Sequence, residues 1–235
     1  MEKIEIKDLS IEVKRSSRRK TVELTVERDG AVVLHAPKEA ALAGLESMVC
    51  ERLLWIYQQL GRKEEELYRL PAKEFVAGEG FYYRGRKYRL KILDSPVSFT
   101  NNEILKLQNG RFILLRQFVP KARETFVTWY TRRAEEWIGR RIQPLQERVG
   151  VRLKSMEVRD LGFRWGSCAE KGKLFFHWRI ILLPPERIDY LILHELVHIR
   201  EHSHNAAFYQ RLRVAAPDYE LHQEWLRENG DRYAL

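Results

Sequence analysis

The sequence predicts an α+β protein, with a hairpin-rich N-terminal region at residues 1–117 and a helical C-terminal region with a short sheet at residues 118–235. In the first region apolar and polar side chains alternate between turn residues, which is typical of strands. After Pro120 the apolar residues recur at helical spacing. A chain of 235 residues, 44% of them hydrophobic, has ample core for this arrangement.

Three hairpins are predicted in the N-terminal region. Alternating residues on either side of Asp29-Gly30 predict the first hairpin at residues 22–34. The other two flank Arg84-Gly85-Arg86 and Asn109-Gly110. Between the first and the second hairpin, a helical stretch is expected from Pro37 to about residue 66.

Helices dominate the expected C-terminal region. One is expected from about residue 120 to 149, with Pro144 kinking or interrupting it. Short strands are expected at residues 154–158 and 173–183, and Pro184-Pro185 ends the second and opens a buried helix. We expect a break near residues 202–203, a helix from about residue 205, and another after Pro217.

The buried helix carries the main functional motif. Residues 194–204 read His-Glu-Leu-Val-His-Ile-Arg-Glu-His-Ser-His and hold four of the chain's seven histidines. On a helix, His194 and His198 lie one turn apart, so both imidazoles reach one metal ion, and Glu195 reaches a water beside it. His204, beyond the expected helix end, supplies a third imidazole. Three neutral nitrogens leave one tetrahedral position of Zn²⁺ open, which is typical of catalytic zinc.

Several segments together carry a family resemblance: Arg164-Trp165-Gly166-Ser167-Cys168, residues 178–185, Asp189-Tyr190 with the motif that follows and Phe208, and upstream Arg18-Arg19-Lys20. This combination resembles the YgjP-like family of zincin-type, zinc-dependent metallohydrolases, which are related to the SprT-like proteases. The resemblance covers most of the chain. It implies a zincin-like C-terminal half, three histidine ligands to zinc, and Glu195 as general acid and base. At the position of His177 the family pattern carries Asn.

Further candidates for the site are less specific. A downstream carboxylate, Glu220 or Glu224, is the alternative third ligand, as in thermolysin-like enzymes. Arg164, which opens the family-like segment, and Tyr209, five residues after His204, are candidate donors to the negative charge that develops in the reaction.

Four other residues near the motif are expected to have supporting roles. His202 is expected to be an exposed capping residue, and His177 a structural histidine with its hydrogen bonds satisfied. Gly166-Ser167-Cys168 is expected to form a tight turn near the metal, and Cys168 is not expected to be a nucleophile. An extended peptide would pair with residues 173–179 by strand addition if that edge were open.

Composition limits the class of protein. No apolar run approaches the ~20 residues of a membrane helix, and the N-terminus has no signal-peptide core. Two cysteines are too few for a disulfide framework, so a cytoplasmic protein is expected. The net charge of +9 favours anionic partners, including nucleic acid and nucleotides, without selecting among them. The sequence does not indicate an oligomeric state.

Three functions are compatible with these residues. The leading hypothesis is a zinc metallopeptidase acting on a peptide or protein, in which Glu195 takes a proton from a metal-activated water and delivers it to the leaving group. The second is a metal-dependent nucleoside triphosphate pyrophosphohydrolase, which the basic balance suits. The third is a nucleic-acid-binding module with a structural metal, which would not require Glu195 at its position.

Overall fold

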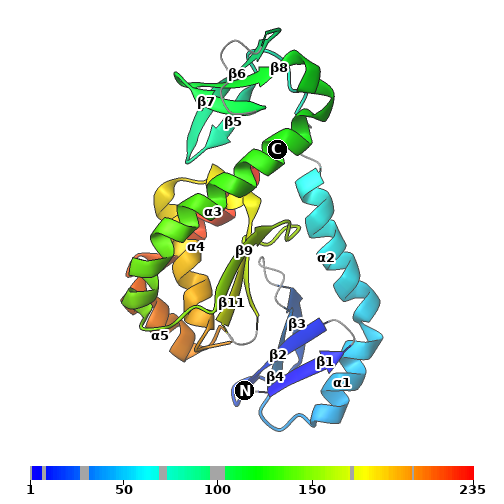
Figure 1. The fold of residues 1–235 in the computed structure, drawn as a ribbon. Helices are drawn as coiled ribbons and strands as arrows, with labels where there is room; N and C mark the ends of the chain where they lie inside the picture. The colour runs from blue at the N-terminus through cyan, green and yellow to red at the C-terminus, as the bar shows by residue number, and fades with distance from the viewer. Residues whose placement is uncertain are drawn as a thin grey trace. The chain divides into compact units, whose positions relative to one another are not determined.

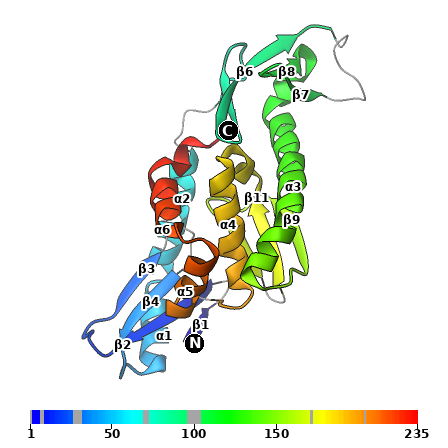
Figure 2. The ribbon, with the colours of Figure 1, turned by 90° about the vertical axis from the view of Figure 1, so that its left-hand side faces the viewer.

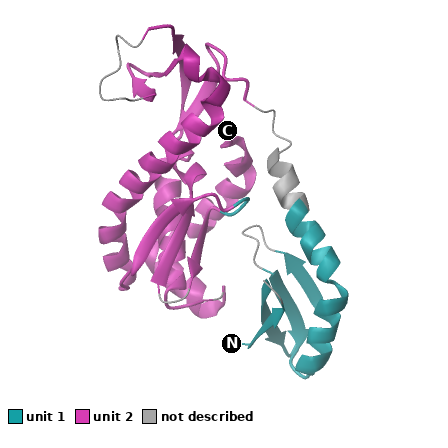
Figure 3. Cartoon of the chain, turned by 45° about the vertical axis from the view of Figure 1, so that its right-hand side comes forward, with its two compact units in different colours: residues 1–69, 162–164 teal, residues 70–161, 165–235 magenta. Residues whose placement is uncertain are grey.

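The computed structural model describes residues 2–6, 9–26, 32–68, 73–95, 104–169, 172–202 and 204–235. For residues 62–68 it describes the backbone only. The chain separates into two compact units (Figure 3). Unit 1 comprises residues 1–69 and 162–164, and unit 2 comprises residues 70–161 and 165–235. Helices and small mixed sheets occur in separate stretches of the chain, which confirms the α+β class.

Unit 1 is a four-stranded sheet with two helices. Strands β1 (Glu2–Ile6), β2 (Leu9–Ser16), β3 (Glu23–Val26) and β4 (Val32–Pro37) take the order β1-β2-β4-β3. The β2–β4 pair is parallel and β3–β4 is antiparallel, as the first predicted hairpin requires. Asp29-Gly30 lies outside the described residues. Apolar residues from the sheet and from both helices form one core.

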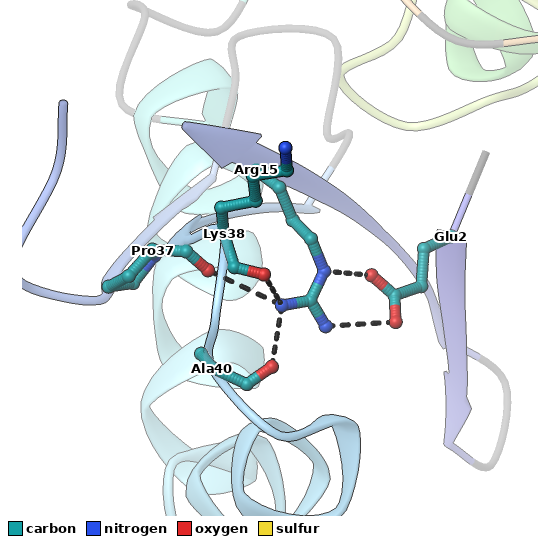
Figure 4. Close-up of polar contacts among 5 residues, drawn as sticks. All are labelled: Glu2, Arg15, Pro37, Lys38 and Ala40. Carbon is teal, nitrogen blue, oxygen red and sulfur yellow. Dashed lines mark hydrogen bonds and ion pairs between the residues drawn. The ribbon is translucent and has the colours of Figure 1, made fainter. Parts of the chain in front are cut away.

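The helical stretch that was predicted from Pro37 begins later and is divided. Helices α1 (Leu42–Glu51) and α2 (Leu53–Tyr68) meet at Arg52. Residues 38–41 are not helical, because the Arg15 guanidinium binds the carbonyl oxygens of Pro37, Lys38 and Ala40 (Figure 4). The same guanidinium pairs with the carboxylate of Glu2, so one side chain joins β1, β2 and the entry to α1.

Unit 2 begins with a second four-stranded sheet, in the order β5-β6-β8-β7. Its strands are β5 (Gly80–Tyr83), β6 (Arg86–Leu93), β7 (Leu105–Gln108) and β8 (Arg111–Leu115). Two-residue turns at Arg84-Gly85 and Asn109-Gly110 have positive φ at both positions, so both predicted hairpins are confirmed as the tight type that matches strand twist.

A long helix connects this sheet to the rest of unit 2. After the 3₁₀ segment η2 (Arg116–Lys121), helix α3 (Ala122–Val149) packs Phe126 and Trp129 against Phe112 of the sheet, with ring centroids 5.1 Å apart in each pair. The expected boundary between residues 117 and 118 therefore lies within one core. Pro144 does not interrupt α3. A proline has no N–H, so the carbonyl of Arg140 loses its hydrogen-bond donor in the helix. Both residues are exposed to water, which can bind this carbonyl instead.

The remaining elements surround one buried helix. Strands β9 (Ser155–Arg159), β10 (Gly166–Ala169) and β11 (Lys173–His177) form a sheet in the order β10-β11-β9. Helices α4 (Pro185–His198), α5 (Ala206–Ala215) and α6 (Tyr219–Asn229) follow, and the last element is the 3₁₀ segment η5 (Gly230–Arg232). Helix α4 lies beside α3 and contacts α5, α6 and β10 (Figures 1 and 2).

The strand predicted at residues 173–183 ends at His177, so the second half of that prediction is wrong. Residues 178–182 form the 3₁₀ segment η4 (Trp178–Leu182). The side chain of His177 accepts a hydrogen bond from the backbone N–H of Arg179, which caps the turn. A continuous apolar run has the same appearance in a buried strand and in a buried turn, and this explains the error.

Candidate metal centre

Helix α4 brings three residues of the motif together. Pro185 at its first position and Glu186 in its first turn favour initiation there, and the helix is buried on most of its surface. His194 and His198 lie one turn apart with ring centroids separated by 5.0 Å. Glu195 follows His194 and is only 6% exposed. The helix ends at His198, before the break expected near residues 202–203, so a third imidazole has to come from another segment.

That segment is the connection to α5, which places His204 opposite the two helical histidines. The side-chain oxygen of Asn205 accepts a hydrogen bond of 2.7 Å from the N–H of Phe208, which caps α5 and fixes the residue after His204. His204 Nε2 lies 3.1 Å from His198 Nε2 and 3.0 Å from His194 Nε2. The three predicted ligands therefore converge at one point.

Phe208 supports all three imidazoles. Its ring is fully buried, and its centroid lies 5.0 Å from that of His194, 4.5 Å from that of His198 and 4.7 Å from that of His204. The ring therefore restricts how far each imidazole can turn away from the others. Phe208 belongs to the residues that carry the family resemblance, but its packing against the imidazoles was not predicted; its position three residues after the N-cap of α5 was a further signal.

The nitrogens that converge fit a divalent cation. Donor atoms of the three histidines lie within 4.8 Å of one another. For zinc with Zn–N bonds of about 2.0–2.1 Å, tetrahedral geometry requires nitrogens about 3.3–3.4 Å apart, close to the 3.0 and 3.1 Å separations. His198 Nδ1 lies 3.0 Å from the carbonyl oxygen of Glu201, so Nδ1 carries the proton and Nε2 presents a lone pair.

Burial also keeps His194 uncharged in the absence of a metal. The pKa of His194 is well below its usual value, first because the ring is buried and then because His198 and His204 are close. His194 is therefore neutral at physiological pH, the form that binds a metal. Its Nδ1 is buried and has no hydrogen-bond partner among the described residues.

The general acid and base candidate lies against strand β10. A Cβ atom added to Gly166 would lie 2.6 Å from Glu195 Oε1 and 2.8 Å from its Cδ, so the space occupied by this carboxylate depends on the glycine. The segment 166–168 is extended strand, and the tight turn predicted there is wrong. Pairing with β11 from Gly166 to Ala169 holds it straight.

Cys168 belongs to the same strand and is not activated as a nucleophile. Burial, and then the nearby carboxylate of Glu195, raise the pKa of its thiol to about 12. A thiol with this pKa remains protonated at neutral pH, which agrees with the expectation that Cys168 is not the nucleophile.

The candidate donors have different positions. Arg164 is exposed and belongs to the short segment that groups with unit 1. Tyr209 lies in α5, where its ring centroid is 6.2 Å from that of His204 and 5.8 Å from that of Tyr219. Tyr209 is therefore beside the histidine cluster, and Arg164 is a residue of the other unit.

The alternative carboxylate ligands are paired elsewhere. Glu220 accepts a hydrogen bond of 2.9 Å from the hydroxyl of Tyr219, and Glu224 pairs with Arg227. Both carboxylates are more than half exposed. In the part of the chain that the structure describes, only the three histidines form a group that could hold a metal.

Two histidines outside the cluster, His177 and His202, were given expected roles, and the structure describes both. His202 is exposed. His177 is buried, its Nδ1 accepts the N–H of Arg179 at 3.0 Å, and its Nε2 lies 3.2 Å from a carboxylate oxygen of Asp160. An Asn side chain would accept the same backbone N–H through its oxygen, so the histidine can replace it as a cap.

Comparison with known proteins gives one match. The family model described as YgjP-like, metallopeptidase domain, matches residues 20–229. No curated protein and no solved structure matches the sequence. Among the described residues, no helix is both long and apolar enough to cross a bilayer. Because the family model spans most of the sequence and includes the histidine cluster, the chain belongs to the YgjP-like family and carries its metallopeptidase-like domain.

Proposed function

We propose that this protein is a zinc-dependent peptidase in which His194, His198 and His204 hold the metal and Glu195 is the general base and acid. The observation that carries the proposal is the convergence of three imidazoles: His204 Nε2 lies 3.1 Å from His198 Nε2 and 3.0 Å from His194 Nε2. Glu195, the residue that follows His194, is a buried carboxylate. A structural site of four protein ligands would have no use for that carboxylate.

The protein groups divide the chemistry. Bound zinc would polarise the substrate carbonyl and acidify a water molecule. The Glu195 carboxylate accepts a proton from that water and then donates it to the amine that leaves. Gly166 leaves room for the carboxylate beside β10, and Phe208 keeps the imidazoles oriented. Tyr209 is the better candidate of the two predicted donors, since its ring lies beside that of His204.

The sheet beside α4 favours a peptide over a nucleotide. Strand β11, where strand addition was predicted, is paired on both sides, so a peptide cannot join it. Strand β10 is paired only with β11 among the described strands, and its first residue lies against Glu195. An extended peptide that added to β10 would place a backbone carbonyl close to the carboxylate and the histidines.

Exchange of Glu195 for Gln tests the mechanism. Zinc-loaded wild type and Glu195→Gln are incubated with a denatured protein mixture, and cleavage is followed by mass spectrometry. We expect the variant to keep its zinc and its melting temperature and to lose at least about a hundredfold in kcat. Glu186→Gln, a change of an exposed residue in the same helix, is the matched control and should retain full activity.

The same proteins are tested against the two other predicted functions. Release of pyrophosphate from nucleoside triphosphates, without peptide cleavage, would contradict the peptidase proposal. A salt-sensitive shift with DNA, in the absence of both activities, would favour a binding module. Full activity of Glu195→Gln on peptides would show that another group transfers the proton.

A further inference from the structure

Arg179 is a buried cation that forms no ion pair with any residue that the structure describes. The residue lies in η4 and is 6% exposed. Its Nε is buried and has no hydrogen-bond partner among the described residues, and none of their carboxylate oxygens lies within 4.0 Å of its guanidinium. Arginines that are buried to this extent normally have an anionic partner, because an unpaired buried charge is costly.

The surrounding charges do not replace such a partner. Asp160 and Asp231 attract the guanidinium from beyond ion-pair distance, while burial, the larger effect, lowers the pKa of Arg179 to about 10. The side chain therefore remains a cation at neutral pH. Its only strong side-chain contact among the described residues is with Trp165, whose ring centroid lies 4.9 Å from the guanidinium carbon.

Trp165 connects this cation to the metal centre. Its carbonyl oxygen accepts a hydrogen bond of 2.9 Å from the N–H of His177, which fixes it at the start of β10. The next residue is Gly166, which lies against the Glu195 carboxylate. On its other side the indole packs against Gly230, where an added Cβ would be 3.4 Å from the ring. The guanidinium therefore stands at the end of β10 nearest to Glu195.

We propose that Arg179, supported by Trp165, binds a carboxylate of the peptide substrate and sets the specificity of the enzyme. This inference rests on the proposed function and extends it to a substrate class. A guanidinium presents parallel N–H donors that match the two oxygens of a carboxylate. A peptide paired along β10 would pass Glu195 and reach Arg179 within about one or two residues. The carboxylate is either the C-terminal group or the side chain of Asp or Glu.

A binding experiment tests the inference without turnover. Metal-free protein is titrated by calorimetry with pentaalanine carrying a free C-terminus, with its C-terminal amide, and with an amidated form that contains one Glu. We expect at least one carboxylate form to bind about ten- to a hundredfold tighter than the plain amide, the range for a charge-assisted hydrogen bond. Arg179→Gln should abolish this preference, and Arg179→Lys should retain part of it.

Arg187 provides a matched control. It also has a buried Nε and lies over an indole, that of Trp225 at 5.0 Å, and its guanidinium contacts His222. Arg187→Gln should leave the carboxylate preference unchanged. An equal loss of affinity for all three peptides in Arg179→Gln, with a lower melting temperature, would make Arg179 a structural residue and overturn the inference.

Turnover by zinc-loaded protein separates this inference from the proposed function. If both are correct, Arg179→Gln raises KM about ten- to a hundredfold for the preferred carboxylate peptide and changes KM for the amide much less. A carboxylate preference in binding without any cleavage would support the Arg179 site and contradict the peptidase function. Binding of ATP that depends on Arg179, with no carboxylate preference, would overturn the inference.

Discussion

Gly166 and Glu195 occupy adjoining space, the glycine on strand β10 and the carboxylate on helix α4. A side chain at position 166 would begin 2.6 Å from Glu195 Oε1 and 2.7 Å from its Cγ. Carbon atoms that are not bonded normally approach to about 3.5 Å. The glycine therefore determines where the carboxylate stands relative to the three imidazoles, although it has no functional group of its own.

Gly166→Ala should consequently impair catalysis without removing the metal. The methyl group displaces the Glu195 carboxylate, and an error of about 1 Å in the position of a catalytic group costs up to about a hundredfold in rate. We expect kcat on the peptide mixture to fall at least tenfold while zinc content, measured by mass spectrometry, stays at the wild-type value.

Gly139→Ala is the control for that substitution. Gly139 lies within α3, and an added Cβ would meet no atom within 4 Å. Alanine should stabilise the helix by about 0.5–1 kcal/mol and leave turnover unchanged. A Gly166→Ala enzyme as active as Gly139→Ala would show that the position of the Glu195 carboxylate tolerates displacement.

His204→Ala should lower the affinity for zinc by at least about a hundredfold, since even residues that only orient a ligand contribute ten- to a hundredfold. The measurement is competition with a chelator at pH 7. Glu220→Gln and Glu224→Gln are the controls, because both carboxylates are occupied by Tyr219 and Arg227. Loss of zinc in either control, with retention in His204→Ala, would assign the third ligand to α6.

The cluster of three histidines could be predicted from the sequence because it depends on local geometry. His194 and His198 are one turn apart in any helix. His204 could be predicted because it lies in the expected break between two helices, and the structure shows Asn205 capping the second of them. The turn residues Asn109-Gly110 likewise predicted a hairpin that the structure contains.

Features that depend on contacts between distant segments could not be predicted. Gly166 lies against Glu195 because α4 packs against β10. The local sequence of either element does not indicate this contact. The end of β11 at His177 depends on a side chain that caps its own turn. Strands β1 and β2 are a different case, because alternating apolar residues such as Ile4, Ile6, Ile11 and Val13 are a local signal for strands.

The two cysteines should differ in reactivity. Cys168 is partly buried, and its thiol pKa of about 12 leaves almost no thiolate at pH 7.5, whereas Cys50 is exposed. Iodoacetamide should therefore label Cys50 much faster, as measured by peptide mapping. Because Glu195 contributes to the high pKa of Cys168, Glu195→Gln should increase the rate at position 168. Equal rates at both cysteines in the wild type would contradict this assignment.

The stability of the metal-free protein should decrease as the pH falls below about 6.5. His222 accepts a hydrogen bond from Arg187 at Nδ1, and its ring stacks on Tyr190 at 5.0 Å. Burial, and then the charge of Arg187, lower its pKa, and the pKa of His194 is lowered for similar reasons. A histidine whose pKa is lower in the folded than in the unfolded state binds protons preferentially when unfolded, so stability is complete above the unfolded pKa and declines below it.

Urea unfolding at pH 5, 6, 7 and 8 measures the effect, and His222→Gln should reduce the slope of the unfolding free energy between pH 5 and 6.5. A free energy of unfolding that is constant or rises toward pH 5 would show that these rings are not held in the neutral form.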